Sequence, residues 1–341
     1  MTESSTLQTA MTRPVTSLSA SLAAEQPAIN IALSEATADL PALVLPIVRH
    51  VLGPGGKRLR PLLTVFVARL LGYTAKDIYP LAAAIEMFHV ATLLHDDVLD
   101  NAVLRRGQTA AHQVFGVTET ILAGDALLAK GNHVVASYSE PRLTASTAEA
   151  IARTAGGEIL ELEQQGKLSE NLLTYLEVIT GKTAWMIRTA CEIGAILAKA
   201  SPSQIAAAAE YGLNLGMAFQ LVDDALDFAP SAQTGKPEGG DVREGKCTPP
   251  ISFYWKTLDA PEQELFAATF AEQRFTDAEV KAVTLAIREQ GLDDKTRTIA
   301  DTYLQRAQDA LDKLTTDLPS ASAPFLSILT DFIIHVRDRN A

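Results

Sequence analysis

Residues 77–100 read DIYPLAAAIEMFHVATLLHDDVLD. The segment is apolar over most of its length, on more than one helical face, and it ends in a cluster of three aspartates. Apolar residues on several faces are typical of a helix inside a large bundle rather than of a surface helix. The segment therefore predicts a buried helix that carries carboxylates at its C-terminal end.

The rest of the chain reads as one helix after another. The interruptions are short and rich in Gly and Pro, which fits antiparallel neighbours, and no run alternates apolar and polar residues as a half-buried strand does. The sequence predicts an all-α fold, a single large bundle of antiparallel helices around a central apolar cavity. Besides 77–100, helices are expected at 31–52, 61–71, 118–137, 144–166, 171–199, 203–228, 249–257, 261–271, 276–290, 293–316 and 323–338.

The N-terminus differs from this pattern. Residues 1–27 are rich in Ser, Thr and Ala, with one Arg and no apolar block, so we expect a flexible tail and no signal peptide. Residues 28–341 are expected to form one domain. Its one long irregular stretch, APSAQTGKPEGGDVREGKCTPP at 229–250, is a candidate lid, because loops of this length in compact domains are usually functional or disordered.

Composition narrows the class of protein. The chain has 341 residues, 47% of them hydrophobic, and a formal net charge of -12. This charge disfavours nucleic acid as a partner and requires cations to bridge any anionic substrate. No uninterrupted apolar run is long enough for a transmembrane helix. The two cysteines, Cys191 and Cys247, are too few for a disulfide framework or a cysteine metal cage, which fits the reducing cytoplasm.

Two acidic motifs share one spacing. HDDVLD at 95–100 and DDALD at 223–227 each place two aspartates four residues apart, on one helix face. Both clusters lie near a helix C-terminus, where the macrodipole also disfavours anions. One such motif alone could be a solvated helix end. Two of them, in otherwise apolar helices, indicate a site for cations, and oxygen ligands with room for water suit magnesium.

Basic residues accompany the two motifs. GGKRLRP at 55–61 precedes an expected helix, and backbone amides at a helix start together with side-chain cations form an anion site. Arg105 and Arg106 follow the first acidic motif, and arginine side chains bind phosphate oxygens in pairs. His89 lies two helical turns before Asp96 and should face the same side, although a buried structural histidine is the alternative. Further donors are Lys182, Thr183, Lys236 and Lys246.

Taken together, these segments resemble the trans-prenyltransferase (polyprenyl synthetase) family, and the pattern before the first motif resembles its long-chain members. The resemblance runs from about residue 30 to the C-terminus. It rests on GGKRLRP (55–61), LLHDDVLD (93–100), RRG (105–107), GD (124–125), GKTA (181–184), GMAFQLVDDALDF (216–228) and GKPEGGDVREGK (235–246). It implies an isoprenoid synthase-type fold, a homodimer, and magnesium-dependent transfer between an allylic diphosphate and isopentenyl diphosphate.

The resemblance also implies residue roles. The magnesium ligands would be Asp96, Asp100 and Asp223, with help from Asp224 and Asp227, around three ions when the allylic diphosphate is bound. The family's isopentenyl diphosphate positions correspond to Lys57, Arg60, His89 and Arg106. Those around the allylic diphosphate correspond to Arg105, Lys182, Thr183, Gln220, Lys236 and Lys246. Asp241 lies in the loop whose ordering would close the site.

In this chemistry the allylic C–O bond breaks, the double bond of isopentenyl diphosphate attacks the carbocation, and a proton leaves, for which the departing diphosphate can act as base. Charge on the leaving group must be stabilised and water excluded. A terpene cyclase would not need the second basic site. A non-catalytic partner subunit tends to lose an acidic motif or the arginine pair, and a di-iron bundle would need Glu-x-x-His pairs. These alternatives are less favoured.

Product length depends on the helix below the first motif. Thr92 and Ala91, four and five residues before Asp96, lie about 6 Å below it at the usual helical rise. Both side chains are small, so a growing chain could pass them, and Phe88, about two turns down, could narrow its path. We expect a product of about eight to ten isoprene units, for a ubiquinone side chain. A shorter-chain synthase and ordinary helix packing at these positions remain the alternatives.

Overall fold

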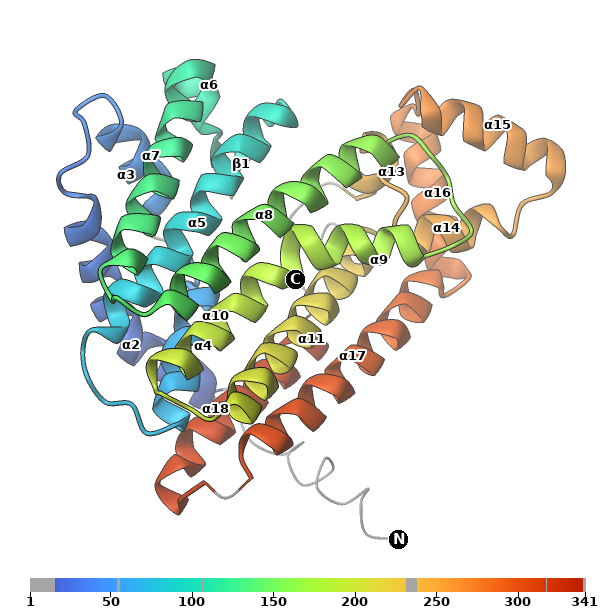
Figure 1. The fold of residues 1–341 in the computed structure, drawn as a ribbon. Coiled ribbons are helices and arrows are strands. Elements are labelled where there is room, and N and C mark those ends of the chain that lie inside the picture. The colour runs from blue at the N-terminus through green and yellow to red at the C-terminus, as the bar shows by residue number, and fades with distance from the viewer. Residues whose placement is uncertain (1–15, 54–55, 106, 231–237, 317, 340–341) are drawn as a thin grey trace, which may run out of the picture.

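The computed structural model describes residues 16–53, 56–105, 107–230, 238–316 and 318–339 (Figure 1). Its first half contains α2 (Thr16–Thr37), α3 (Leu45–Leu52), α4 (Leu59–Leu70), α5 (Ile78–Leu99), α6 (Ala111–Phe115), α7 (Val117–Ala136), α8 (Pro141–Gln164), α9 (Leu173–Ile179) and α10 (Trp185–Leu197). The second half contains α11 (Pro202–Leu226), α13 (Gly240–Glu244), α14 (Pro249–Trp255), α15 (Ala260–Ala271), α16 (Asp277–Glu289), α17 (Leu292–Leu314) and α18 (Ala323–Arg337). A π-helical turn, Thr180–Ala184, joins α9 to α10, and a 3-10 turn, Ser320–Ser322, precedes α18.

These helices confirm the predicted all-α bundle. The expectation of no strands was wrong at one place. Strands β1 (Leu104–Arg105) and β2 (Gln108–Thr109) form a two-stranded antiparallel hairpin directly after the first acidic motif. Two residues per strand are too few to produce a recognisable alternation of apolar and polar side chains, so this hairpin could not be predicted from the hydrophobic pattern.

The predicted flexible tail is also corrected in part. Residues 16–27 belong to α2, and buried Leu18 and Ile29 pack into the main core. Pro27 lies inside this helix. The tail was predicted from the Ser-, Thr- and Ala-rich composition without an apolar block, and this composition did not reveal the few apolar side chains that anchor the helix. Residues 1–15 lie outside the described part of the chain.

Helix α5 lies deep in the bundle, as residues 77–100 predicted. It packs against α7, α2, α4 and α10, and Ala82, Ala83, Ala84 and Ile85 are fully buried. Among the described residues, α5 alone is long and apolar enough to cross a membrane, but 67% of its most apolar window is buried inside the protein. A core helix passes the same test of length and composition, so α5 is weak evidence for a membrane span.

A second, smaller core positions the loop after α11. Phe228, Val242, Ile251, Phe270 and other side chains bury one another among α13, α14, α15 and α16. In Figure 1 these helices lie together beyond one end of α11. This core holds the helix α13, which belongs to the predicted lid, against the end of the second acidic motif.

Candidate active site

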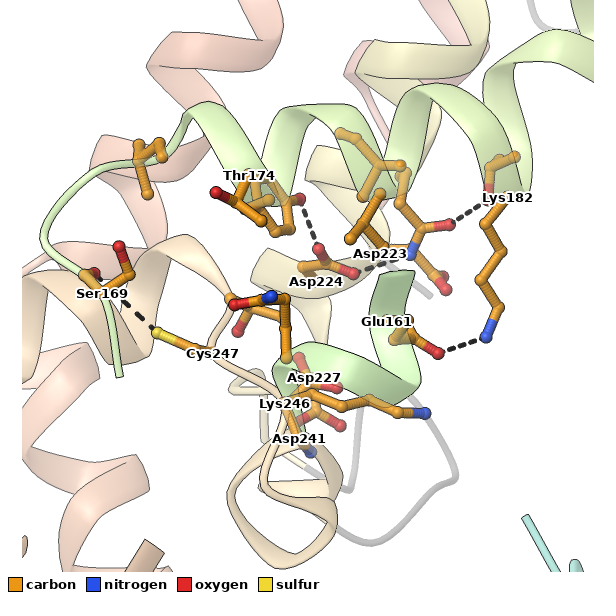
Figure 2. A pocket seen from close by; sticks show the side chains of 18 of the residues that line it. Glu161, Ser169, Thr174, Lys182, Asp223, Asp224, Asp227, Asp241, Lys246 and Cys247 are labelled. Carbon is orange, nitrogen blue, oxygen red and sulfur yellow. Dashed lines mark hydrogen bonds and ion pairs between the residues drawn. The ribbon is translucent and has the colours of Figure 1, made fainter. Parts of the chain in front are cut away.

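A cavity of about 310 Å³ opens where α8, α9, α11 and the segment around α13 meet (Figure 2). Its lining comes from segments far apart in the sequence and contains many of the predicted site residues. These are Lys182, Thr183, Gln220, Asp223, Asp224, Asp227 and Lys246. The structure therefore brings the second acidic motif together with the predicted allylic-site donors.

The π-helical turn presents Lys182 to this cavity. Gly157 on α8 and Gly181 on the turn touch closely: a Cβ added to Gly181 would lie 2.7 Å from the carbonyl oxygen of Arg153, and one added to Gly157 would collide with the backbone nitrogen of Lys182. π-helical turns occur often at functional sites. Here the close contact fixes the turn against α8.

Two carboxylates that the sequence analysis missed hold Lys182. Its Nζ lies 2.7 Å from Glu158 Oε2 and forms a second, shorter ion pair with Glu161. Burial alone would lower the pKa of Lys182, but Glu161 and Glu158 raise it overall, so the side chain stays charged. The signal was available in the sequence, since the two acids lie three residues apart on one face of α8.

Lys246, after α13, has a similar environment. Its Nζ lies 2.7 Å from Glu244 Oε2. Burial opposes the charge, but Glu161 and Glu244, with a smaller effect of Asp100, raise the pKa of Lys246. Asp100 belongs to the first acidic motif, so Lys246 links the two ends of the site electrostatically.

In the second acidic motif, Asp227 holds the loop. It accepts hydrogen bonds from the backbone N–H groups of Gly240 (3.1 Å) and Asp241 (2.9 Å), at the start of α13. Burial raises the pKa of Asp227, and these two bonds oppose the shift. Asp241 lies beside it with Oδ2 buried and no protein hydrogen-bond partner among the described residues. Burial, with Asp227 and Asp224, raises the pKa of Asp241 well above its usual value.

The other two aspartates of this motif have different partners. Asp223 forms a 2.9 Å ion pair with Arg339, whose guanidinium lies over the ring of Phe219, 4.5 Å from its centre. The sequence analysis did not predict a role for this arginine near the end of the chain. Asp224 is buried and bonded to Tyr175 and Gln220. Burial raises the pKa of Asp224 to about 7.

The first acidic motif interacts electrostatically with Glu158 and Lys182, the ion pair described above. Burial, followed by the nearby carboxylate of Glu158, raises the pKa of Asp96 to about 7, and Lys182 opposes the shift. Asp97 is 2% exposed and accepts a hydrogen bond of 2.6 Å from Arg105 Nε. Asp97 therefore orients Arg105. The two motifs meet around Lys182 and Lys246, although the cavity lining does not include Asp96 or Asp100.

The described part of the chain contains no ready-made metal cage. Among the described residues, no group of three or more His, Cys, Asp or Glu side chains is arranged to hold an ion. Magnesium does not require such a cage, because it usually keeps several waters and binds one or two carboxylates plus substrate phosphates. Burial raises the pKa of both Asp96 and Asp224 to about 7, so a cation bound beside them would stabilise carboxylates that have little contact with solvent. The donor set fits a hard divalent cation.

The basic side chains of the GGKRLRP segment differ in their burial. Arg58 is 4% exposed and forms a 2.8 Å ion pair with Glu86 on α5. Arg60 Nη1 lies 3.1 Å from His89 Nε2, so these two predicted site residues are together. Lys57 is exposed. Arg106 and Lys236, predicted for the two diphosphates, lie outside the described residues.

The predicted chain-length residues lie on the buried side of α5. Ala91 and Phe88 are fully buried, and a Cβ added to Gly131 on α7 would lie 2.6 Å from the Phe88 ring. Thr92 Oγ1 donates to the carbonyl of His89, 2.8 Å away. None of these three side chains lines the 310 Å³ cavity. Their effect on product length stays a prediction.

Comparison with known proteins gives a consistent result. Residues 41–287 match the family model for polyprenyl synthetase. The chain is 34% identical over 286 residues to octaprenyl diphosphate synthase of Escherichia coli, covering 84% of this chain and 86% of that protein. It is 34% identical over 267 residues to heptaprenyl diphosphate synthase component 2 of Geobacillus stearothermophilus, covering 78% and 82%.

Solved structures agree with the sequence relatives. A decaprenyl diphosphate synthase from Rhodobacter capsulatus superposes with a TM-score of 0.88 and 34% identity, over 96% of this chain and 100% of that one. A polyprenyl synthase from Caulobacter crescentus, complexed with calcium and isoprenyl diphosphate, also gives 0.88 and 34%, over 96% and 98%. With the family model matching most of its length, this chain belongs to the polyprenyl synthetase family and is a prenyltransferase of the trans-isoprenyl diphosphate synthase type.

Proposed function

We propose that the protein is a long-chain all-trans polyprenyl diphosphate synthase, which adds isopentenyl diphosphate repeatedly to an allylic diphosphate. The observation that carries this proposal is one cavity that gathers the second acidic motif with Lys182 and Lys246. Asp96 and Asp100 of the first motif lie near enough to interact electrostatically with the same two lysines. Anionic substrates and two acidic motifs can share one site only if cations lie between them. Similarity to octaprenyl and decaprenyl diphosphate synthases supports the long-chain assignment.

Magnesium is the proposed cofactor, with three ions when the allylic diphosphate is bound. Asp96, Asp100 and Asp223 would hold it directly, with Asp224 and Asp227 supporting Asp223. The calcium complex of the Caulobacter relative supports divalent-ion dependence. When bound, the ions supply positive charge that stabilises the leaving diphosphate.

The chain's own cations complete the allylic site. Lys182 and Lys246 remain charged despite burial, and Arg105 is oriented by Asp97. Fixed positive charges of this kind stabilise negative charge as it develops on the leaving group. Thr183 and Gln220, which line the same cavity, add neutral hydrogen-bonding groups, and Lys236 is expected to act with them from the loop.

Isopentenyl diphosphate would bind at Lys57, Arg60, His89 and Arg106. Two described members of this set, Arg60 and His89, are in contact. The homoallylic double bond would attack the allylic cation there, while the apolar interior excludes water.

The direct test is incubation with isopentenyl diphosphate, farnesyl diphosphate and magnesium, followed by chromatographic sizing of the dephosphorylated product. We expect products of roughly 40 to 50 carbons. Replacing Asp223 with Asn should abolish elongation. Elongation by a single unit, to 20 carbons, would favour a shorter-chain synthase, which similarity to a geranylgeranyl diphosphate synthase also allows. No elongation would favour a non-catalytic partner subunit.

The chain-length proposal has its own test. Ala91→Phe would place an aromatic ring about one turn below Asp96 and should shorten the product, whereas Ala91→Ser keeps the side chain small and should preserve it. Both variants must melt cooperatively, since Ala91 is fully buried. An unchanged product from a folded Ala91→Phe enzyme would refute the proposed path of the chain along α5.

A homodimer in the cytoplasm, supplying a ubiquinone side chain, completes the proposal. Helices α7 and α8 pack side by side and expose large apolar side chains, among them Val117 and Ile121 on α7 and Ile159 and Leu162 on α8. A second copy of the chain would cover such a surface. Light scattering should give twice the monomer mass for the wild type and a smaller mass for Ile121→Glu.

A further inference from the structure

The carboxylate of Asp224 is held on both of its oxygens. The Tyr175 hydroxyl donates to Oδ2 at 2.5 Å, and Gln220 Nε2 donates to Oδ1 at 2.7 Å. Figure 2 shows both bonds converging on Asp224. The residue is 7% exposed. A buried carboxylate with a donor on each oxygen is fixed in one orientation, because turning it would leave polar atoms unpaired.

The same network reaches the turn that carries Lys182. Gln220 Oε1 accepts a hydrogen bond of 2.9 Å from Thr183 Oγ1, and Thr183 follows Lys182 in the π-helical turn. Tyr175 lies on α9, immediately before that turn, and Asp224 lies on α11. The network therefore joins the second acidic motif to the lysine that the substrate would contact.

Asp223, the neighbouring residue, is in a different position. Its side chain is 38% exposed and pairs with Arg339. Consecutive residues on an α-helix point about 100° apart, given 3.6 residues per turn, so Asp223 and Asp224 cannot serve the same role. Asp223 faces solvent and could exchange Arg339 for a metal ion, whereas both oxygens of Asp224, which also lines the cavity, are already bonded to the protein.

We propose that Tyr175 is a positioning residue for prenyl transfer. Its hydroxyl fixes Asp224, and Asp224 in turn fixes Asp223 and the Lys182 turn. Neither Tyr175 nor Asp224 touches metal or substrate. This inference rests on the proposed function, because it assigns Asp223 to metal. Partners that orient a metal ligand through hydrogen bonds typically change metal affinity when they are removed.

The experiment measures Mn²⁺ binding to the full chain without substrate, by the loss of the free Mn²⁺ EPR signal. Tyr175→Phe removes one oxygen atom and should weaken binding, towards the roughly 10- to 100-fold typical of such partners. Asp224→Asn should weaken binding to a similar degree, while Asp223→Asn should weaken it further, leaving only the ions that Asp96 and Asp100 hold. Tyr254→Phe, at another partly buried tyrosine, is the matched control and should bind as the wild type does.

A double variant separates positioning from general packing. If Tyr175 acts only through Asp224, adding Tyr175→Phe to Asp224→Asn should change Mn²⁺ affinity no further. Gln220→Leu probes the other oxygen of the same carboxylate and should weaken binding as Tyr175→Phe does, so the inference stays testable if one variant misfolds.

Three results would overturn it: wild-type affinity in a folded Tyr175→Phe protein, multiplying effects in the double variant, or complete loss of binding in Asp224→Asn. Failure of the proposed function gives a different pattern. Absent prenyl transfer by the wild type, with the predicted affinities intact, would reject the activity and retain the network.

Discussion

The buried ion pair between Arg58 and Glu86 provides a sharp test of how the fold builds the isopentenyl diphosphate site. Both side chains are 3% exposed, and the guanidinium lies 2.8 Å from Glu86 Oε1. It also donates to the backbone carbonyls of Leu52 and Gly53. Arg58 has a φ of 51°, in the left-handed region, so these contacts also hold a strained backbone position next to Lys57.

The perturbation is Arg58→Met, which keeps much of the side-chain volume and removes the charge. Removing one partner of a buried pair leaves the other charge uncompensated and costs about 3–5 kcal/mol. We expect the free energy of unfolding, measured with urea, to fall by this amount. In Arg58→Met/Glu86→Leu most of the loss should be recovered, because an apolar pair can replace a buried ion pair with little net cost.

The assay also has a functional arm. The Arg58→Met enzyme should show a raised KM for isopentenyl diphosphate with an unchanged product length, because the loop that carries Lys57 loses its anchor. The control is Arg142→Met, which breaks an exposed pair with Glu140 and should leave unfolding almost unchanged. A loss below about 1 kcal/mol in Arg58→Met, the range of surface pairs, would refute the reasoning. So would a double variant no more stable than the single one.

Four further predictions concern the active site. Gly157→Ala should push the Lys182 turn away from α8. A misplacement of about 1 Å can lower kcat by roughly 100-fold, and we expect a loss of this size. A kcat within threefold of the wild type in steady-state kinetics would contradict the prediction. Arg339→Gln removes the cation paired with Asp223. A partly exposed ion pair contributes about 1 kcal/mol, so Mn²⁺ binding should become about fivefold tighter. Weaker binding in the same EPR titration would show that Arg339 does not compete with the metal for Asp223. Because the pKa of Asp96 is raised to about 7, protons compete with metal for this carboxylate below that pH. Mn²⁺ affinity should therefore fall about tenfold per pH unit for each proton displaced. A Mn²⁺ affinity that does not change between pH 5.5 and 8 would contradict this competition. The same shift should make the metal-free fold less stable as pH rises from about 4 to about 7, because the folded state binds the proton more tightly than the unfolded state does.

Most helices were predictable because their signals are local. The 3.6-residue apolar period marks their interiors, and their starts have chemical signatures. Ser201 and Gln204 form a capping box at the start of α11, with Pro202 in its first turn, as helix starts favour. Thr276 and Glu279 do the same for α16. Such contacts join residues three positions apart, so the sequence alone reveals them.

The candidate site was predictable only where its residues lie close together in the sequence. Acidic and basic motifs stand out by spacing, but the partners of these residues come from other helices. Asp224 meets Tyr175, 49 residues away. Arg339 reaches Asp223 from near the end of the chain. No local pattern encodes such pairings, because they depend on how helices pack. For the same reason the sequence could not show that Asp97 serves Arg105 rather than a metal.

Close packing through glycine is how this fold brings like charges together. Gly157 meets the π-helical turn, Gly216 on α11 lies where an added Cβ would be 2.7 Å from Ala184 Cα, and Gly194 on α10 lies against the backbone of Thr64 on α4. Each contact sets helices nearer than a larger side chain would allow. Burial, followed by repulsion from neighbouring carboxylates, raises the pKa values of Asp96 and Asp224 to about 7. Apolar packing along the helices must therefore offset that repulsion, and a divalent ion that binds at the helix ends would relieve it, so metal binding should stabilise the fold as well as serve the reaction.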